Sequence, residues 1–195
     1  MGPSGVGKTT LLAEYISGQN ALFEFSVSYA TREKRANEVH GKHYFFVSEQ
    51  EFLKMKDEGK FIEWFKVHDS YKGTAKHVVD DIIKKGKIPV FDVDIQGAKK
   101  IYDVYPEANF LCVLPPSYDK LEARLQKRGT ETPESLAIRM KTAKVELNGI
   151  LEHPEIFQYR VVNDDLQKAK KTFDCLLQTL YAKEMGKKVP QHVVE

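Results

Sequence analysis

The first nine residues of the chain contain the pattern Gly-x-x-x-x-Gly-Lys-Thr, which ends at Lys8 and Thr9. Glycines allow backbone conformations that turn successive amide hydrogens inward, and a helix that begins directly after the loop directs its positive end to the same place. Such a loop binds the phosphates of a nucleotide. We expect Lys8 to reach the β- and γ-phosphates and the Thr9 hydroxyl to bind magnesium. A turn that merely joins a strand to a helix would not need all four fixed positions.

The loop predicts a binding site for ATP, and we assign to it the whole pattern and the residue that follows. These residues are Gly2, Pro3, Ser4, Gly5, Val6, Gly7, Lys8, Thr9 and Thr10. The pattern normally follows a buried β-strand, yet only Met1 precedes it here. Either the sequence starts late or the protein lacks that strand. We expect a late start, with some loss of stability.

Composition limits the class of protein. The chain has 195 residues, 42% of them hydrophobic, which favours one compact α/β unit. The net charge is +2, so no global field would attract nucleic acid or an anionic membrane. Cys112 and Cys175 fit small buried hydrophobic residues rather than a disulfide or a metal site. No apolar run reaches about 20 residues and no export signal is seen, so we expect a cytoplasmic protein without membrane partners. We also expect no nucleic-acid partner. The expected oligomeric state is a monomer or a homodimer.

Apolar runs alternate with amphipathic stretches, which favours an α/β fold in which helices connect the strands of a sheet. We expect strands at residues 22–27, 44–47, 61–67, 88–93, 110–114 and 159–162. We expect helices at residues 8–17, 117–127, 133–152 and 166–183, and a loose tail at 186–195. A further short helix should begin at the capping box of Ser48 and Glu51 and end at Gly59.

The part of the chain after the phosphate loop is richer in strands than the rest and has the character of an inserted lobe. We divide the chain into a nucleotide-binding core of residues 1–27 and 77–195, with a lid at about 124–145, and a lobe of residues 28–76. In the lobe, Arg32 and Arg35 form a cationic fork suited to a dianionic phosphate. Ordinary surface ion pairs are the alternative in a chain with 30% charged residues.

The order and spacing of the motifs resemble the guanylate kinase family over nearly the whole chain. The matching segments are residues 25–38, 41, 44–48, 61–64, 73–74, 92–97, 115–117, 128–132 and 163–166. The resemblance implies a P-loop nucleoside monophosphate kinase fold, with a central parallel sheet flanked by helices, an inserted mixed α/β lobe that binds GMP, and a small helical lid. It implies Mg²⁺-dependent transfer of the γ-phosphoryl group of ATP to GMP or dGMP, giving ADP and GDP.

The resemblance assigns the lobe to the acceptor. Arg32, Arg35 and Tyr44 would hold the phosphate of GMP. Glu63 would accept the adjacent N1–H and amine of guanine, whereas adenine has a lone pair at N1 and would leave the carboxylate unpaired. The remaining residues that the resemblance assigns to guanine are Ser28, Thr74 and Asp94.

Some positions of the lobe depart from the family pattern. Lys34 and Asn37 replace a usual proline and glycine, which suggests a more mobile loop and slightly weaker binding. Lys72 stands where the family usually has a phosphate-binding tyrosine, and would meet phosphate as a charge instead of a hydroxyl. Glu38 either orients the arginines of the GMP site or is a solvated surface charge, and both interpretations stay open.

Phosphoryl transfer depends on cations that neutralise charge on the transferring group. Beside Lys8, the resemblance makes Arg124, Arg128 and Arg139 catalytic residues that close over the phosphates. Arg124 and Arg128 lie four residues apart on an expected helix, and spacing alone would favour a solvated helix face, so their catalytic role rests on the resemblance.

Two polar residues follow expected strands. Asp92 ends a buried strand, as does the acidic residue that assists magnesium in many phosphate-loop enzymes, so it would hold the ion through water. Asn163 lies beside the adenine of ATP by resemblance, although the segment 163–165 could simply cap the next helix.

Two other functions remain open at this point. One is a catalytically weak, guanylate-kinase-like module that binds peptides in the acceptor groove, although such modules typically lose the phosphate loop. The other is a related phosphate-loop kinase for another phosphorylated acceptor, for which Lys72 would be the telling change.

Overall fold

The structure is a computed structural model that describes residues 1–17, 21–67, 69–127, 129 and 132–186. Within these residues the chain is of mixed α/β type, as its alternating pattern predicts. The chain forms two compact units. The first unit consists of Met1–Ser17, Val93–Ile95 and Glu107–Glu195, and the second consists of Gly18–Asp92 and Gln96–Pro106.

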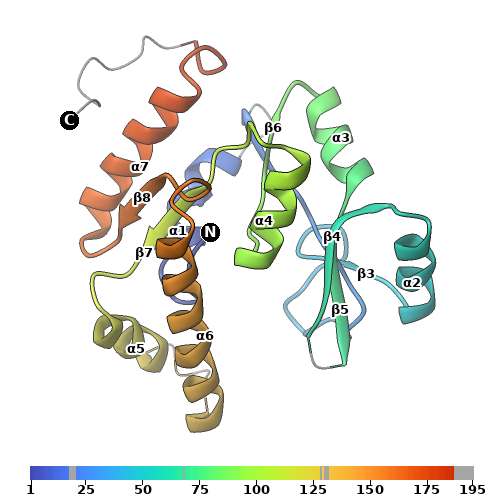
Figure 1. The fold of residues 1–195 in the computed structure, drawn as a ribbon, viewed down its shortest axis with the longest axis horizontal. Helices are drawn as coiled ribbons and strands as arrows, with labels where there is room; N and C mark the ends of the chain where they lie inside the picture. The colour runs from blue at the N-terminus through green and yellow to red at the C-terminus, as the bar shows by residue number, and fades with distance from the viewer. Residues whose placement is uncertain (18–20, 68, 128, 130–131, 187–195) are drawn as a thin grey trace. The chain divides into compact units, whose positions relative to one another are not determined.

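The first unit contains a pair of parallel strands packed with helices. In chain order its elements are α1 (Lys8–Ile16), β7 (Leu111–Leu114), α5 (Tyr118–Lys127), α6 (Pro133–Glu152), β8 (Tyr159–Val162) and α7 (Leu166–Leu180). β7 and β8 pair along their whole length without a register shift. Figure 1 shows α7 beside β8 and α5 beside α6. Cys112, Val113 and Val161 are buried on the two strands, as expected for short apolar runs.

Side-chain caps start the last two helices where the sequence predicts. The hydroxyl of Thr132 accepts the N–H of Ser135 at 3.2 Å ahead of α6. The carboxylate of Asp165 accepts the N–H of Lys168 at 2.8 Å ahead of α7. Each cap satisfies a backbone donor that has no partner within the helix.

The second unit contains a four-stranded sheet and a separate parallel pair. Its elements are β1 (Phe23–Phe25), β2 (Tyr29–Ala30), β3 (Phe45–Phe46), α2 (Glu49–Asp57), β4 (Phe61–Val67), β5 (Ser70–Ala75), α3 (Lys76–Lys84), β6 (Ile88–Val90) and most of α4 (Ile95–Val104). The larger sheet has the order β3-β2-β5-β4, with β5 antiparallel to both neighbours and β2 parallel to β3. β1 and β6 form the parallel pair.

An aromatic cluster holds α2 against the larger sheet. Phe52 of α2 is fully buried and stacks on Phe61 of β4, with ring centroids 4.4 Å apart. The same ring stacks on Tyr71 of β5 at 5.4 Å. Ser48 caps α2 by accepting the N–H of Glu51, as the capping box predicts. The sheet therefore has its own hydrophobic support.

The structure contains four elements that the sequence analysis did not predict: β2, β5, α3 and α4. β5 includes Lys72, Gly73 and Thr74, and these polar and small residues do not resemble a strand. α3 did carry a signal, because its buried residues Val79 and Ile82 recur at helical spacing.

Two predicted ranges also need correction or fall outside the description. β6 ends at Val90 and not at residue 93, because its partner β1 ends at Phe25, directly opposite Val90. Of the predicted tail, residues 187–195 lie outside the described residues. Over the part of the chain that the structure describes, no helix combines the length and apolar character needed to cross a bilayer.

Candidate active site

The phosphate loop leaves the edge of β7 at a very close approach. Met1 pairs with β7: its ammonium donates to the carbonyl of Leu111 at 2.8 Å, and the N–H of Val113 donates to the carbonyl of Met1 at 2.9 Å. Gly2 follows with φ 133°, and a Cβ there would lie 2.2 Å from the carbonyl oxygen of Val113. Only glycine fits this first position of the pattern.

The loop ends at the start of α1, which carries no side-chain cap. Gly7 is the N-cap residue, with φ 99°, and the first turn contains no acidic residue. The N-cap residue therefore offers no side-chain oxygen that would compete with an anion for the first amide groups of α1. Thr9 and Thr10 are exposed in this first turn.

Two cationic side chains reach the loop. The Lys8 ammonium donates to the carbonyl of Gly2 at 2.5 Å and to that of Pro3 at 3.3 Å. From α6, the Arg139 guanidinium donates to the hydroxyl of Ser4 at 2.9 Å. The structure thus brings one predicted catalytic arginine onto the loop, although 135 residues separate it from Ser4.

The other predicted arginines differ in how they are placed. Arg124 of α5 donates to the backbone carbonyl of Asp164 at 3.3 Å. Lys120, one turn earlier on α5, pairs with the carboxylate of Asp164 at 2.7 Å and lowers the pKa of that group. Arg128 lies outside the described residues. The sequence analysis missed Lys120, although its spacing of four from Arg124 was a usable signal.

Asn163 is buried beneath the loop. Its backbone N–H donates to the carbonyl of Leu114 at the end of β7, at 2.8 Å. Its side-chain amide donates to the carbonyl of Val6 at 2.9 Å. Only 6% of the residue is exposed. The structure therefore joins the end of β8 to the middle of the phosphate loop.

In the second unit, a buried carboxylate pairs with a buried hydroxyl. Glu63 of β4 is 2% exposed and accepts a hydrogen bond of 2.6 Å from the hydroxyl of Thr74 on β5. The pairing of β4 with β5 shifts register between Phe61 and Glu63. Such a bulge redirects side chains and is common beside functional sites. The sequence carried no evident signal for it.

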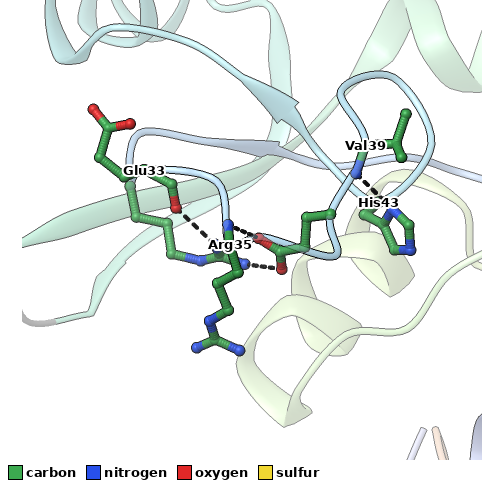
Figure 2. A network of polar contacts seen from close by, with 6 residues as sticks. Glu33, Arg35, Val39 and His43 are labelled. Atoms are coloured by element: carbon green, nitrogen blue, oxygen red, sulfur yellow. Dashed lines mark hydrogen bonds and ion pairs between the residues drawn. The ribbon is translucent and has the colours of Figure 1, made fainter.

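Next to β2, a loop holds Arg32 in a bidentate ion pair. Both terminal nitrogens of Arg32 donate to the carboxylate of Glu38, at 2.6 and 2.5 Å, and the backbone N–H of Arg35 donates to it at 2.8 Å. These bonds hold the pKa of Glu38 at about 2 and raise that of Arg32. Figure 2 shows the Arg35 guanidinium pointing away from this network. It also shows the N–H of Val39 donating to His43, at 2.9 Å.

Two cationic side chains lie over the ring of Tyr44. The Arg32 guanidinium lies 5.1 Å from the ring centroid, and the Lys72 ammonium lies 5.2 Å from it. Lys72 is half-buried in β5, opposite Ala30 of β2. The structure therefore brings Arg32, Glu38, Tyr44 and Lys72 together in one place.

A guanylate kinase family model matches residues 1–180 of this sequence. The chain belongs to the guanylate kinase family. It is 44% identical over 168 residues to a guanylate kinase of Caldanaerobacter subterraneus, which covers 86% of this chain and 79% of that protein. It is 43% identical to a guanylate kinase of Thermotoga maritima, with the same coverage of both chains. The structure is also similar to the crystal structure of guanylate kinase from Anaplasma phagocytophilum, with a TM-score of 0.64 and 29% sequence identity. The match covers 94% of this chain and 83% of that chain.

The comparisons confirm the predicted family, the P-loop nucleoside monophosphate kinase fold and the kinase activity. Guanylate kinase is an ATP-dependent phosphotransferase, so the match favours an enzyme over a peptide-binding module. It equally disfavours a kinase for another acceptor, in spite of Lys72.

The remaining predicted site residues are Ser28, Asp92 and Asp94. Ser28 lies between β1 and β2 and accepts the N–H of Phe45 through its backbone. Asp92 is exposed, two residues after the end of β6, and Asp94 belongs to the first unit. Over the described residues, no group of three or more His, Cys, Asp or Glu side chains could by itself hold a metal ion.

Proposed function

We propose that the chain transfers the γ-phosphoryl group of ATP to GMP. ATP would bind at the phosphate loop, and GMP would bind at the residues around Arg32 and Glu63. The observation that carries the acceptor assignment is the buried Glu63, held by Thr74. Guanine presents N1–H and an exocyclic amine as adjacent donors, which one carboxylate can accept together. Adenine presents a lone pair at N1, so its binding would leave buried charge without compensation.

The phosphate of GMP binds to Arg32, Arg35, Tyr44 and Lys72. Glu38 neutralises one of the three cations and fixes the plane of the Arg32 guanidinium. Arg32, Arg35 and Lys72 together with Glu38 then have a net charge of +2, which matches a dianionic phosphate. Arg35 stays available, because Glu38 binds its backbone N–H and not its side chain. Ser28 and Asp94 complete the proposed contacts with guanine.

The phosphates of ATP bind to residues 2–10, and the transfer step is in-line. A phosphate oxygen of GMP attacks the γ-phosphorus, and the bond from that phosphorus to the β–γ bridging oxygen breaks, so that ADP leaves. Lys8 of the loop and Arg139 of α6, which contacts the loop, neutralise charge on the transferring group, together with Arg124 and Arg128.

The oxygen donors of the chain fit Mg²⁺. Thr9 offers an exposed hydroxyl in the first turn of α1, and Asp92 offers an exposed carboxylate for a water-mediated contact. Thr9 would be the direct protein ligand and Asp92 would hold a bound water, since Mg²⁺ keeps several waters and takes substrate phosphate oxygens. The bound ion would supply charge neutralisation at the β- and γ-oxygens.

We also propose a cytoplasmic location and a monomer or homodimer. Cys112 and Cys175 are free thiols, as a reducing compartment would keep them. Ultracentrifugation at several protein concentrations would distinguish the two oligomeric states.

A coupled assay for ADP formation tests the proposed function. With ATP and Mg²⁺, the protein is compared on GMP, AMP, CMP and UMP at equal concentration. We expect turnover restricted to GMP and abolished in Lys8→Ala. Equal turnover with AMP, or full activity in Lys8→Ala, would contradict the proposal.

A further inference from the structure

We infer that Asn163 is a positioning residue for the phosphate loop. This inference rests on the proposed role of residues 2–9 in binding the phosphates of ATP. It differs from the prediction that Asn163 contacts adenine, because in the structure its amide is directed at the loop.

Asn163 is held by hydrogen bonds from both its backbone and its side chain. Its backbone belongs to the β7–β8 ladder through the bond to Leu114. Through its side chain, Nδ2 donates a buried hydrogen bond of 2.9 Å to the carbonyl of Val6. A buried bond of this kind leaves a carbonyl without a partner if the amide is removed, and this carbonyl belongs to the loop itself.

The loop approaches Asn163 so closely that position 7 must be glycine. A Cβ on Gly7 would lie 2.5 Å from Nδ2 of Asn163. That separation is below any ordinary contact between a carbon and a nitrogen atom, and the φ of 99° disfavours other residues as well. The last glycine of the pattern therefore serves the contact with Asn163.

The bond to Val6 fixes the direction of an amide hydrogen. In a planar trans peptide the carbonyl of one residue and the N–H of the next point in opposite directions. Because Asn163 binds the carbonyl of Val6, the N–H of Gly7 points away from Asn163 and to the other side of the loop. Inward-turned amides are what such a loop offers to phosphates. Asn163 thereby prepares one phosphate donor without touching the nucleotide.

This role and an adenine contact make different predictions for nucleotides with other bases. A positioning residue affects every nucleotide that places phosphates on the loop, whatever its base. An amide that contacts adenine affects ADP more than IDP, because inosine lacks the exocyclic amine at C6. Direct binding of the two nucleotides separates the alternatives without requiring turnover.

The test measures the affinities of ADP and IDP by calorimetry with Mg²⁺, for the wild type, Asn163→Ala and Asn163→Asp. Asn163→Asp keeps the size of the side chain, creates no cavity, and opposes the Val6 carbonyl with an oxygen. Tyr15→Phe is the matched control, since it removes another side-chain bond of the first unit, from α1 to Asp174 of α7. Thermal melting of each variant checks that it is folded.

We expect both Asn163 variants to bind ADP and IDP about ten-fold more weakly, with the ratio of the two affinities unchanged. Tyr15→Phe should lose thermal stability but keep both affinities. An unchanged affinity in a folded Asn163 variant, or a loss confined to ADP, would overturn the inference. The proposed function is judged separately, by turnover of the wild type with GMP.

Discussion

The carboxylate of Glu38 binds the guanidinium of Arg32 through both oxygens, at 2.6 and 2.5 Å, and so holds it over the ring of Tyr44. An arginine fixed in one plane loses less conformational entropy when it binds a phosphate. In the proposed acceptor site, Glu38 would therefore orient Arg32 and would not itself bind the phosphate. Of the two interpretations left open by the sequence, the geometry favours the orienting role.

The first prediction concerns the stability of the protein at low pH. The native pKa of Glu38 is about 2, below its ordinary value near 4.5, so the unfolded state binds the proton more readily. Stability from this pair is present above about pH 4.5 and is lost as the pH falls toward 2. Urea unfolding at pH 6, 4 and 3 should show a smaller decline in Glu38→Gln than in the wild type. Parallel declines would contradict the prediction.

Replacing Glu63 by glutamine should relax the choice of base. The amide keeps the size of the carboxylate but presents one acceptor and one donor, so guanine loses a partner. We expect kcat/KM for GMP to fall about 100-fold and the preference for GMP over AMP to fall at least ten-fold. Glu58→Gln is the control, because Glu58 forms an exposed ion pair in the same unit. If Glu63→Gln behaves like this control, Glu63 does not read the base.

Lys72 should contribute charge to the GMP site. In Lys72→Met the net charge of the proposed phosphate site, which also includes Arg32, Arg35 and Glu38, falls from +2 to +1. We therefore expect KM for GMP to rise about five-fold and to depend less on salt. KM for ATP should not change. Lys66 is a matched control on the same sheet, since its ammonium lies 4.8 Å from the ring of Tyr71. An equal effect of Lys66→Met on KM would show that the change is not local.

Arg139 should act mainly on the transfer step. Its contact with Ser4 places it on the phosphate loop, and removal of one preorganised cation typically costs about 100-fold in kcat. We expect that loss in Arg139→Ala, with KM for GMP nearly unchanged. Lys141→Ala, an exposed cation on the same helix, serves as the comparison. A kcat within three-fold of the wild type would exclude a catalytic role.

The elements that the sequence predicts correctly have local signals. The capping box at Ser48 and the starts of the helices at Pro133 and Leu166 depend on neighbours a few residues away, and the structure has all three. The positions of the strands at residues 61–67 and 159–162 were also fixed by local apolar runs.

The features that the sequence does not predict depend on residues far away along the chain. The end of β6 depends on the length of β1, which is more than 60 residues away in sequence. The contact of Asn163 with Val6 joins residues 157 apart, and no spacing rule could reveal it. Likewise β5 is a strand because β2 and β4 pair with it, although its own residues are polar.

The bulge between Phe61 and Glu63 lets β4 pass two residues while β5 passes one. Regular pairing of the intact strand from Phe61 and Ala75 onward would place Ile62 opposite Thr74 and Glu63 opposite Gly73. Side chains alternate between the faces of a strand, so the carboxylate would then lie on the other face of the sheet. The position of the carboxylate beside the Thr74 hydroxyl therefore depends on the register of β4 as well as on the residue type at position 63.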